Sequence, residues 1–210
     1  MSKINNLIRV SEEQAKVAGK VLARAFHDYP TMNYLFPYED EKSRKLPKIF
    51  EYLVRYGIMY GEVFSNSPNI EGVAVWLPFW EAEMTDDKVF KCAISYSDGR
   101  ELGSILGEEY QKRYEPIEKC EYRCHKQYAD FSHWYLYPIG VDPIHQGRGY
   151  AGLLLREKFA EIDKQNMPCY LETNTEKKVS LYQHFGFEIV EEGIIPEIDV
   201  PYWAMLRKKD

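Results

Sequence analysis

A glycine-rich segment, QGRGYAG at residues 146–152, has the residue types and the spacing of a phosphate site. It follows a predicted buried strand at 135–141 and a turn at Asp142-Pro143, and it precedes a pattern of helical period. Gly147 and Gly149 let the backbone approach a ligand closely and offer unobstructed N–H groups. The helix that begins here adds free amides and a partial positive charge. The segment therefore predicts a phosphate-binding loop.

The strand before this loop contains Pro138, with Gly140 two residues later. Proline cannot donate to a sheet ladder, and glycine weakens a strand further. A central strand of this composition is expected to part from a neighbour or to bulge. An ordinary bulge at the strand end is the alternative.

Residues 147–152 also match the pattern GxGxxG of dinucleotide-binding folds, with Glu172 at a plausible distance for an acidic partner. In those folds the strand runs almost directly into the first glycine. Here residues 142–146 intervene, and the loop lies in the last third of the chain, with too little sequence after it for the remaining βα units. An NAD-dependent oxidoreductase is therefore the weaker interpretation.

Three segments match a different pattern. QGRGYA at 146–151 fits Q/R-x-x-G-x-G/A, IGVDP at 139–143 precedes it, and LYQHFGF at 181–187 follows. In this order and near this spacing, they resemble the GNAT superfamily of N-acetyltransferases. The resemblance covers about the last third of the chain.

The resemblance implies a mixed, mostly antiparallel α/β sheet that is splayed between its fourth strand (135–141) and its fifth (169–173), with helices on both faces. In that family the gap holds the pantetheine arm of acetyl-CoA, and the loop holds its phosphates. The residues that would bind this cofactor are Ile139, Gly140, Val141, Gln146, Gly147, Arg148, Gly149, Tyr150, Ala151, Gly152 and Asn174.

The same resemblance gives Tyr182 the role of general acid toward the departing coenzyme A thiolate. Core packing is its alternative role. Glu172 is the candidate base, because an amine is mostly protonated at neutral pH and must lose a proton before it attacks. An outward-facing strand glutamate is the alternative there, and His133 is a rival base. Related enzymes commonly place asparagine seven residues before the tyrosine, where this chain has Thr175; the adjacent Asn174 is the residue expected to bond the pantetheine or its water.

Composition favours a globular cytoplasmic protein. The 210 residues are 45% hydrophobic and 15% aromatic, without a membrane-length apolar run or a signal-peptide core. A net charge of −6 and no Lys/Arg-rich run argue against nucleic acid. Cys120, Cys124 and His125 lack a fourth ligand, so no metal is expected. A monomer or a homodimer is expected.

Read in order, the chain begins β-α-α-β-β, with a capping box at Ser11 and Gln14 and a hairpin of strands 62–65 and 72–78. This is how GNAT domains begin. Residues 81–130 show no strand and form a predicted helical insert, broken near 98–100, 103, 107 and 116. A single domain over residues 1–210 is expected, with strands 187–190 and 202–207 closing the sheet.

The predicted function is transfer of acetyl from acetyl-CoA to a primary amine, small or peptidic, by direct attack in a ternary complex. The alternative outside enzymes is a non-catalytic acyl-CoA sensor. The sequence does not identify the acceptor. Residues 26–38, with Tyr29 and Tyr34, and the helical insert are expected to line the acceptor side, since loops on a rigid scaffold usually carry specificity.

Overall fold

The computed structural model describes residues 3–4, 6–94, 103, 105 and 107–208. Eight strands form one sheet in the order β1-β2-β3-β4-β5-β6-β8-β7. Their bounds are β1 Lys3–Ile4, β2 Leu7–Arg9, β3 Glu62–Ser65, β4 Gly72–Pro78, β5 Trp134–Val141, β6 Cys169–Thr173, β7 Glu188–Ile195 and β8 Val200–Arg207. Within the described sheet, β5 and β6 are the parallel pair and the other neighbours are antiparallel. The predicted mixed sheet is confirmed, with β1 added at its edge.

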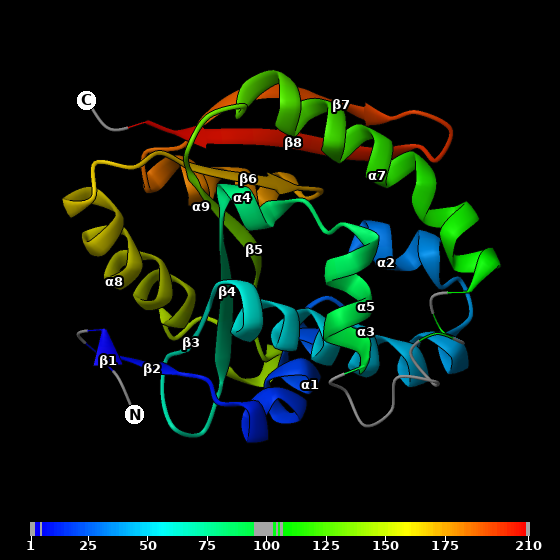
Figure 1. Cartoon of the computed structure of the whole chain (residues 1–210), viewed down its shortest axis with the longest axis horizontal. Helices are drawn as coiled ribbons and strands as arrows, with labels where there is room; N and C mark the ends of the chain where they lie inside the picture. The colour runs from blue at the N-terminus through cyan, green and yellow to red at the C-terminus, as the bar shows by residue number, and fades with distance from the viewer. Residues whose placement is uncertain (1–2, 5, 95–102, 104, 106, 209–210) are drawn as a thin grey trace.

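Helices cover both faces of the sheet (Figure 1). One face packs against α1, α3, α5 and α7, and the other against α8 and α9. The helix bounds are α1 Ala15–Ala25, α2 Pro30–Leu35, α3 Glu39–Tyr60, α4 Phe79–Ala82, α5 Asp86–Ile94, α7 Glu108–Tyr128, α8 Tyr150–Lys164 and α9 Glu176–His184. No helix in the described ranges is both long and apolar enough to cross a bilayer.

The insert between β4 and β5 is helical, as predicted, but one of its predicted breaks is wrong. Helix α7 continues through Pro116, because the apolar contacts on either side outweigh the single backbone hydrogen bond that proline removes. Gly107 does precede the helix, as its N-cap. The break predicted at 98–100 lies outside the described residues. Helix α7 crosses β7 and β8 (Figure 1). Arg123 of α7 forms an ion pair with Glu191 of β7, with Nη2–Oε1 at 2.5 Å.

Strand β5 carries the irregularity that Pro138 predicts. Ala74 on β4 pairs with Ile139, but Trp76 pairs with Leu136, so β5 has one extra residue in a bulge around Pro138. On its other side, β5 pairs with β6 only at Trp134 and Tyr135. The remaining length of β5 therefore has β4 as a neighbour and faces a gap on the β6 side.

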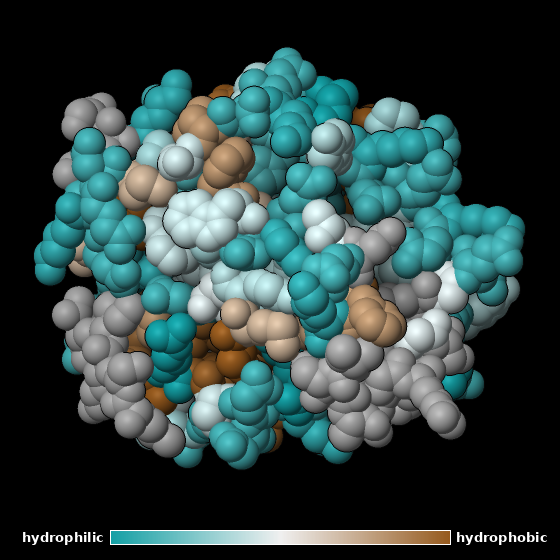
Figure 2. Space-filling model, viewed as in Figure 1, coloured by the Kyte–Doolittle hydropathy of each residue, from teal (hydrophilic) through white to brown (hydrophobic). Residues whose placement is uncertain are grey.

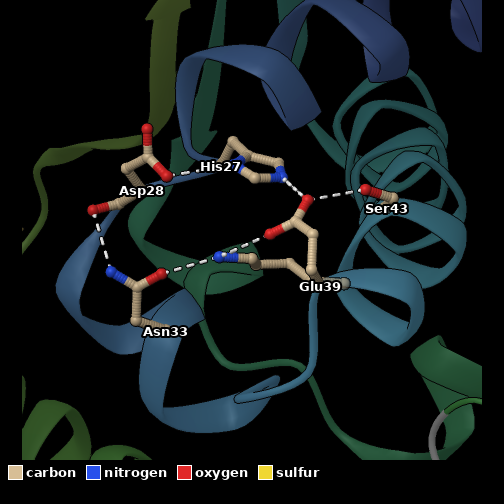
Figure 3. A network of polar contacts seen from close by, with 6 residues as sticks. His27, Asp28, Asn33, Glu39 and Ser43 are labelled. Atoms are coloured by element: carbon tan, nitrogen blue, oxygen red, sulfur yellow. Dashed lines mark hydrogen bonds and ion pairs between the residues drawn. The ribbon is translucent and has the colours of Figure 1, made fainter.

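A polar network fixes the turn between α1 and α2 against the start of α3 (Figure 3). His27 bonds Asp28 through Nδ1 (3.0 Å) and Glu39 through Nε2 (2.8 Å). Asn33 donates to the Asp28 carbonyl at 3.2 Å, and Ser43 donates to Glu39 at 2.9 Å. Tyr29, the next residue of the turn, is thereby held in place.

Close packing of α1 on α3 generates a stability prediction. A Cβ at Gly19 would lie 2.5 Å from the backbone N of Glu51, an atom that cannot move without shifting α3. We expect Gly19→Ala to lower the free energy of unfolding by about 1–3 kcal/mol through overpacking. Urea unfolding measures this, with the neighbouring exposed Lys20→Ala as control. An unchanged midpoint in the glycine variant would contradict the packing described.

Candidate active site

The glycine loop has the backbone geometry of a ligand cradle. Gly147 and Gly149 have φ of +76° and +80°, in the left-handed region that favours glycine. A Cβ built on either residue would meet no heavy atom within 4 Å. The N–H of Leu153 is bonded to the Gly149 carbonyl at 2.9 Å, and the first-turn amides before it have no intrahelical acceptor. The loop therefore presents open space, an exposed Arg148 and the positive end of α8.

Two side-chain contacts fix this loop relative to the sheet. The buried carboxylate of Asp142 accepts from Arg24 of α1, with Nε–Oδ2 at 2.8 Å, and from the Ile144 N–H at 3.3 Å. Gln146 donates through Nε2 to the Val141 carbonyl at 3.1 Å. The loop is thus tied to both α1 and the end of β5.

The gap between β5 and β6 contains a half-buried lysine. Lys178 of α9 donates through Nζ to the Ile139 carbonyl at 3.5 Å, so this carbonyl faces the gap. The same ammonium lies 5.1 Å from the Phe26 ring centroid and 5.8 Å from that of Tyr29. Burial lowers the pKa of Lys178 to about 8.

A cavity of about 1020 Å³ adjoins this gap. Of the residues singled out from sequence, it is lined by Ile139, Glu172, Asn174, Tyr182 and Tyr29. Tyr34 and His133 do not line it. The structure therefore brings both candidate catalytic residues and one of the two tyrosines together.

Glu172, on β6, is half-buried in this cavity. Its Oε2 accepts from the Tyr135 hydroxyl at 2.6 Å, and the Tyr170 hydroxyl lies near enough to the carboxylate to lower its pKa. Its buried Oε1 forms no hydrogen bond of normal geometry with the described residues. Burial raises the pKa of Glu172 to about 7. The carboxylate is therefore more basic than that of a solvent-exposed glutamate.

Tyr182, on α9, is 4% exposed and packs its ring 5.8 Å from that of Phe187. It therefore belongs to the core and to the cavity wall at once. Burial raises the pKa of its phenol, so the hydroxyl stays protonated throughout the neutral range.

Tyr29 reaches the end of β6 from the turn between α1 and α2. Its hydroxyl shares a hydrogen bond with Thr173 Oγ1 at 2.9 Å and accepts from the Asn174 N–H at 2.8 Å. The side-chain amide of Asn174 donates to the Pro201 carbonyl at 2.8 Å, so in this structure it holds the start of β8.

His133 is fully buried, with Nδ1 2.7 Å from the Phe131 carbonyl and Nε2 2.9 Å from Nε2 of His125. His125, on α7, is the histidine that lines the cavity. Burial lowers the pKa of His125 to about 4. Sequence reasoning selected the histidine behind the cavity wall and missed the one in it.

Helix α7 also contributes a second carboxylate that sequence reasoning missed. One stripe of this helix lines the cavity: Tyr110, Tyr114, Ile117, Glu121 and His125. Glu121 accepts from the Tyr114 hydroxyl at 3.2 Å, and burial together with the negative charge of Glu172 raises its pKa. The side of the molecule over α7 in Figure 2 is hydrophilic. The sequence signal that could have identified Glu121 was its position at helical spacing from the aromatic residues of the same helix face.

Comparisons with known proteins agree on one family. The model of the acetyltransferase (GNAT) domain matches residues 90–189. An uncharacterized N-acetyltransferase, C550.08 of Schizosaccharomyces pombe, is 29% identical over 212 residues, which cover 96% of this chain and 83% of the relative.

Solved structures share the fold. Histone acetyltransferase HPA2 and related acetyltransferase from Corynebacterium glutamicum superposes with a TM-score of 0.66 at 23% identity, covering 98% of this chain and 96% of that one. Arylalkylamine N-acetyltransferase 2 from Aedes aegypti gives 0.59 at 13% identity, covering 97% and 98%.

The raised pKa of Glu172 generates a prediction about pH and stability. The pKa of this carboxyl is about 7 in the folded protein and near 4.5 in the unfolded chain, so the folded state binds the proton more tightly. The stability that this difference provides is therefore lost as the pH rises from about 4.5 past 7. We expect Glu172→Gln to raise the free energy of unfolding at pH 8 by about 1–3 kcal/mol and to change it little at pH 4.5. Denaturant unfolding at both pH values tests this, with the exposed Glu188→Gln as control. An equal effect at both would rule out the raised pKa.

Proposed function

We propose that this chain, an acetyltransferase that belongs to the GNAT superfamily, transfers acetyl from acetyl-CoA to the primary amine of a small molecule by direct attack in a ternary complex. The observation that carries the proposal is a juxtaposition. The glycine loop opens α8 beside the unpaired edge of β5, and the gap at that edge adjoins the cavity with Glu172 and Tyr182.

The residues present fit coenzyme A. Gly147 and Gly149 leave open the space that a Cβ would fill, so the diphosphate would bind the amides of residues 147–152. The pantetheine arm would follow β5 along Ile139 and Val141, where β6 has separated. NAD fits less well, because the mixed sheet is not the parallel sheet of dinucleotide-binding folds.

In the proposed reaction, Glu172 accepts the proton of the attacking nitrogen. Tyr135 donates to Oε2, which leaves Oε1 to accept from the amine directly or through water. A pKa near 7 suits a general base that works at neutral pH. When bound, acetyl-CoA supplies the thioester carbonyl carbon that the amine attacks.

Tyr182 provides the second proton transfer. Its hydroxyl would hold a proton ready for the thiolate that leaves when acetyl-CoA is the donor. The buried phenol keeps this proton well above neutral pH, so the acid is in its required form while Glu172 is in the basic form. The two proton movements use separate residues on α9 and β6.

Gly149→Asp tests the cradle. The change adds a carboxylate at the proposed phosphate position and a side chain at φ +80°, so we expect coenzyme A affinity to fall at least ~100-fold. Calorimetric titration measures this affinity.

Thermal shift of the wild type with acetyl-CoA and NAD in parallel shows which nucleotide stabilises the folded state. A folded variant with unchanged coenzyme A affinity would exclude this loop, and a wild-type response to NAD alone would exclude acetyl transfer.

Tyr182→Phe tests the acid. The change removes one hydroxyl and keeps the ring that packs on Phe187, so fold and coenzyme A affinity should be retained. We expect the rate of thiol release with an amine acceptor to fall roughly 10²–10⁴-fold. Stopped-flow kinetics measures this rate. Phe187→Leu, which changes the ring that Tyr182 packs against and leaves the Tyr182 hydroxyl in place, is the control for packing. A rate within about threefold of wild type would remove Tyr182 from the mechanism.

A further inference from the structure

We infer that the acceptor is a dication, an aliphatic amine with a second amino or guanidino group, and that Glu121 binds this second group while the reacting nitrogen lies at Glu172. The inference rests on the proposed function, since it assigns the acceptor of the same site. It depends on residues of α7 that the family motifs at 139–187 do not include.

Glu121 is placed for a ligand in the cavity. It lies on the stripe of α7 that faces the cavity, between Ile117 and His125. The Tyr114 hydroxyl donates to its Oε2 at 3.2 Å. A neutral phenol orients the carboxyl group but supplies no positive charge, so the ionised form of Glu121 is disfavoured until a cation binds beside it.

The second carboxylate of the pair, Glu172, likewise has only neutral hydroxyl groups beside it, those of Tyr135 and Tyr170, and none of them supplies a positive charge. Oε1 of Glu172 is buried and forms no hydrogen bond of normal geometry within the described residues. The charge of Glu172 raises the pKa of Glu121, which places the two groups within electrostatic reach of each other. Two cationic groups joined by a short chain would compensate both charges at once.

The lysine side chains that line this cavity do not neutralise Glu121 or Glu172. Lys119 pairs with Glu115 at 2.6 Å on the exposed side of α7, and Lys126 lies over the Tyr122 ring. Lys178 is bonded to the Ile139 carbonyl. In the part of the chain that the structure describes, neither Glu121 nor Glu172 forms an ion pair.

The walls between the carboxylates suit an alkyl chain with cationic ends. Tyr110 stacks on Tyr114 with ring centroids 5.7 Å apart, and Tyr135 stacks on Tyr137 at 5.3 Å. Such rings contact methylene groups and attract cations through their faces. An aromatic monoamine would also fit against tyrosines, but it would leave the half-buried Glu121 without a cationic partner.

The experiment compares matched acceptors with the full chain and acetyl-CoA: 1,5-diaminopentane, n-pentylamine and 2-phenylethylamine. We expect kcat/KM for the diamine to exceed that for pentylamine by roughly 10- to 100-fold, the usual worth of a charge-assisted hydrogen bond. Glu121→Gln should bring this ratio close to one, mainly through KM for the diamine. Glu115→Gln, on the exposed side of the same helix, should keep the ratio.

A binding measurement complements the kinetics. Without acetyl-CoA, the diamine should raise the melting temperature of the wild type and of Glu115→Gln, but not of Glu121→Gln. Equal use of the diamine and pentylamine, preference for 2-phenylethylamine, or a ratio unaffected by Glu121→Gln would overturn the inference and leave amine acetylation intact. Coenzyme A binding without acetylation of any of the three amines, or of a wider amine panel, would overturn the proposed function itself.

Discussion

The separation of β5 from β6 is the constraint on which the site depends. Pro138 cannot donate to a ladder, and the extra residue around it bends β5 while β4 stays paired. After Trp134 and Tyr135, β5 no longer reaches β6. Polar backbone groups in the gap need other partners, and one of them, the Ile139 carbonyl, already takes a hydrogen bond from Lys178. A ligand with amide groups along an extended arm would satisfy such an edge as a missing strand does.

The two ends of this gap are held by contacts between segments far apart in sequence. At the loop, Arg24 of α1 binds the buried Asp142. At the end of β6, Tyr29 binds Thr173 and Asn174, and the His27 network holds the turn that carries it. The N-terminal helices therefore position both the proposed phosphate cradle and the proposed acceptor side. A site that is held before its ligands arrive loses less conformational freedom when they bind.

The cavity is costly to maintain, because it holds two partly buried carboxylates in one lining. Burial raises the pKa of both Glu121 and Glu172, and each shift means that the ionised form destabilises the fold at neutral pH. Replacement of either by a neutral residue is expected to stabilise the folded state. Such a cost is typical of sites where charge is held ready for a ligand or a proton.

The sequence by itself determined the local features. Strand bounds at 62–65, 72–78 and 169–173, the helix after Ser11 and the loop at 146–152 depend on alternation, capping and glycine within a few residues, and the structure has them as predicted. Only the tertiary structure decided that Glu121 and Glu172 line the same cavity, that His125 and not His133 faces it, and that Tyr34 lies outside it. These placements depend on how α7 packs across the sheet. That packing is set by long-range contacts such as Arg123 with Glu191, which no local pattern contains.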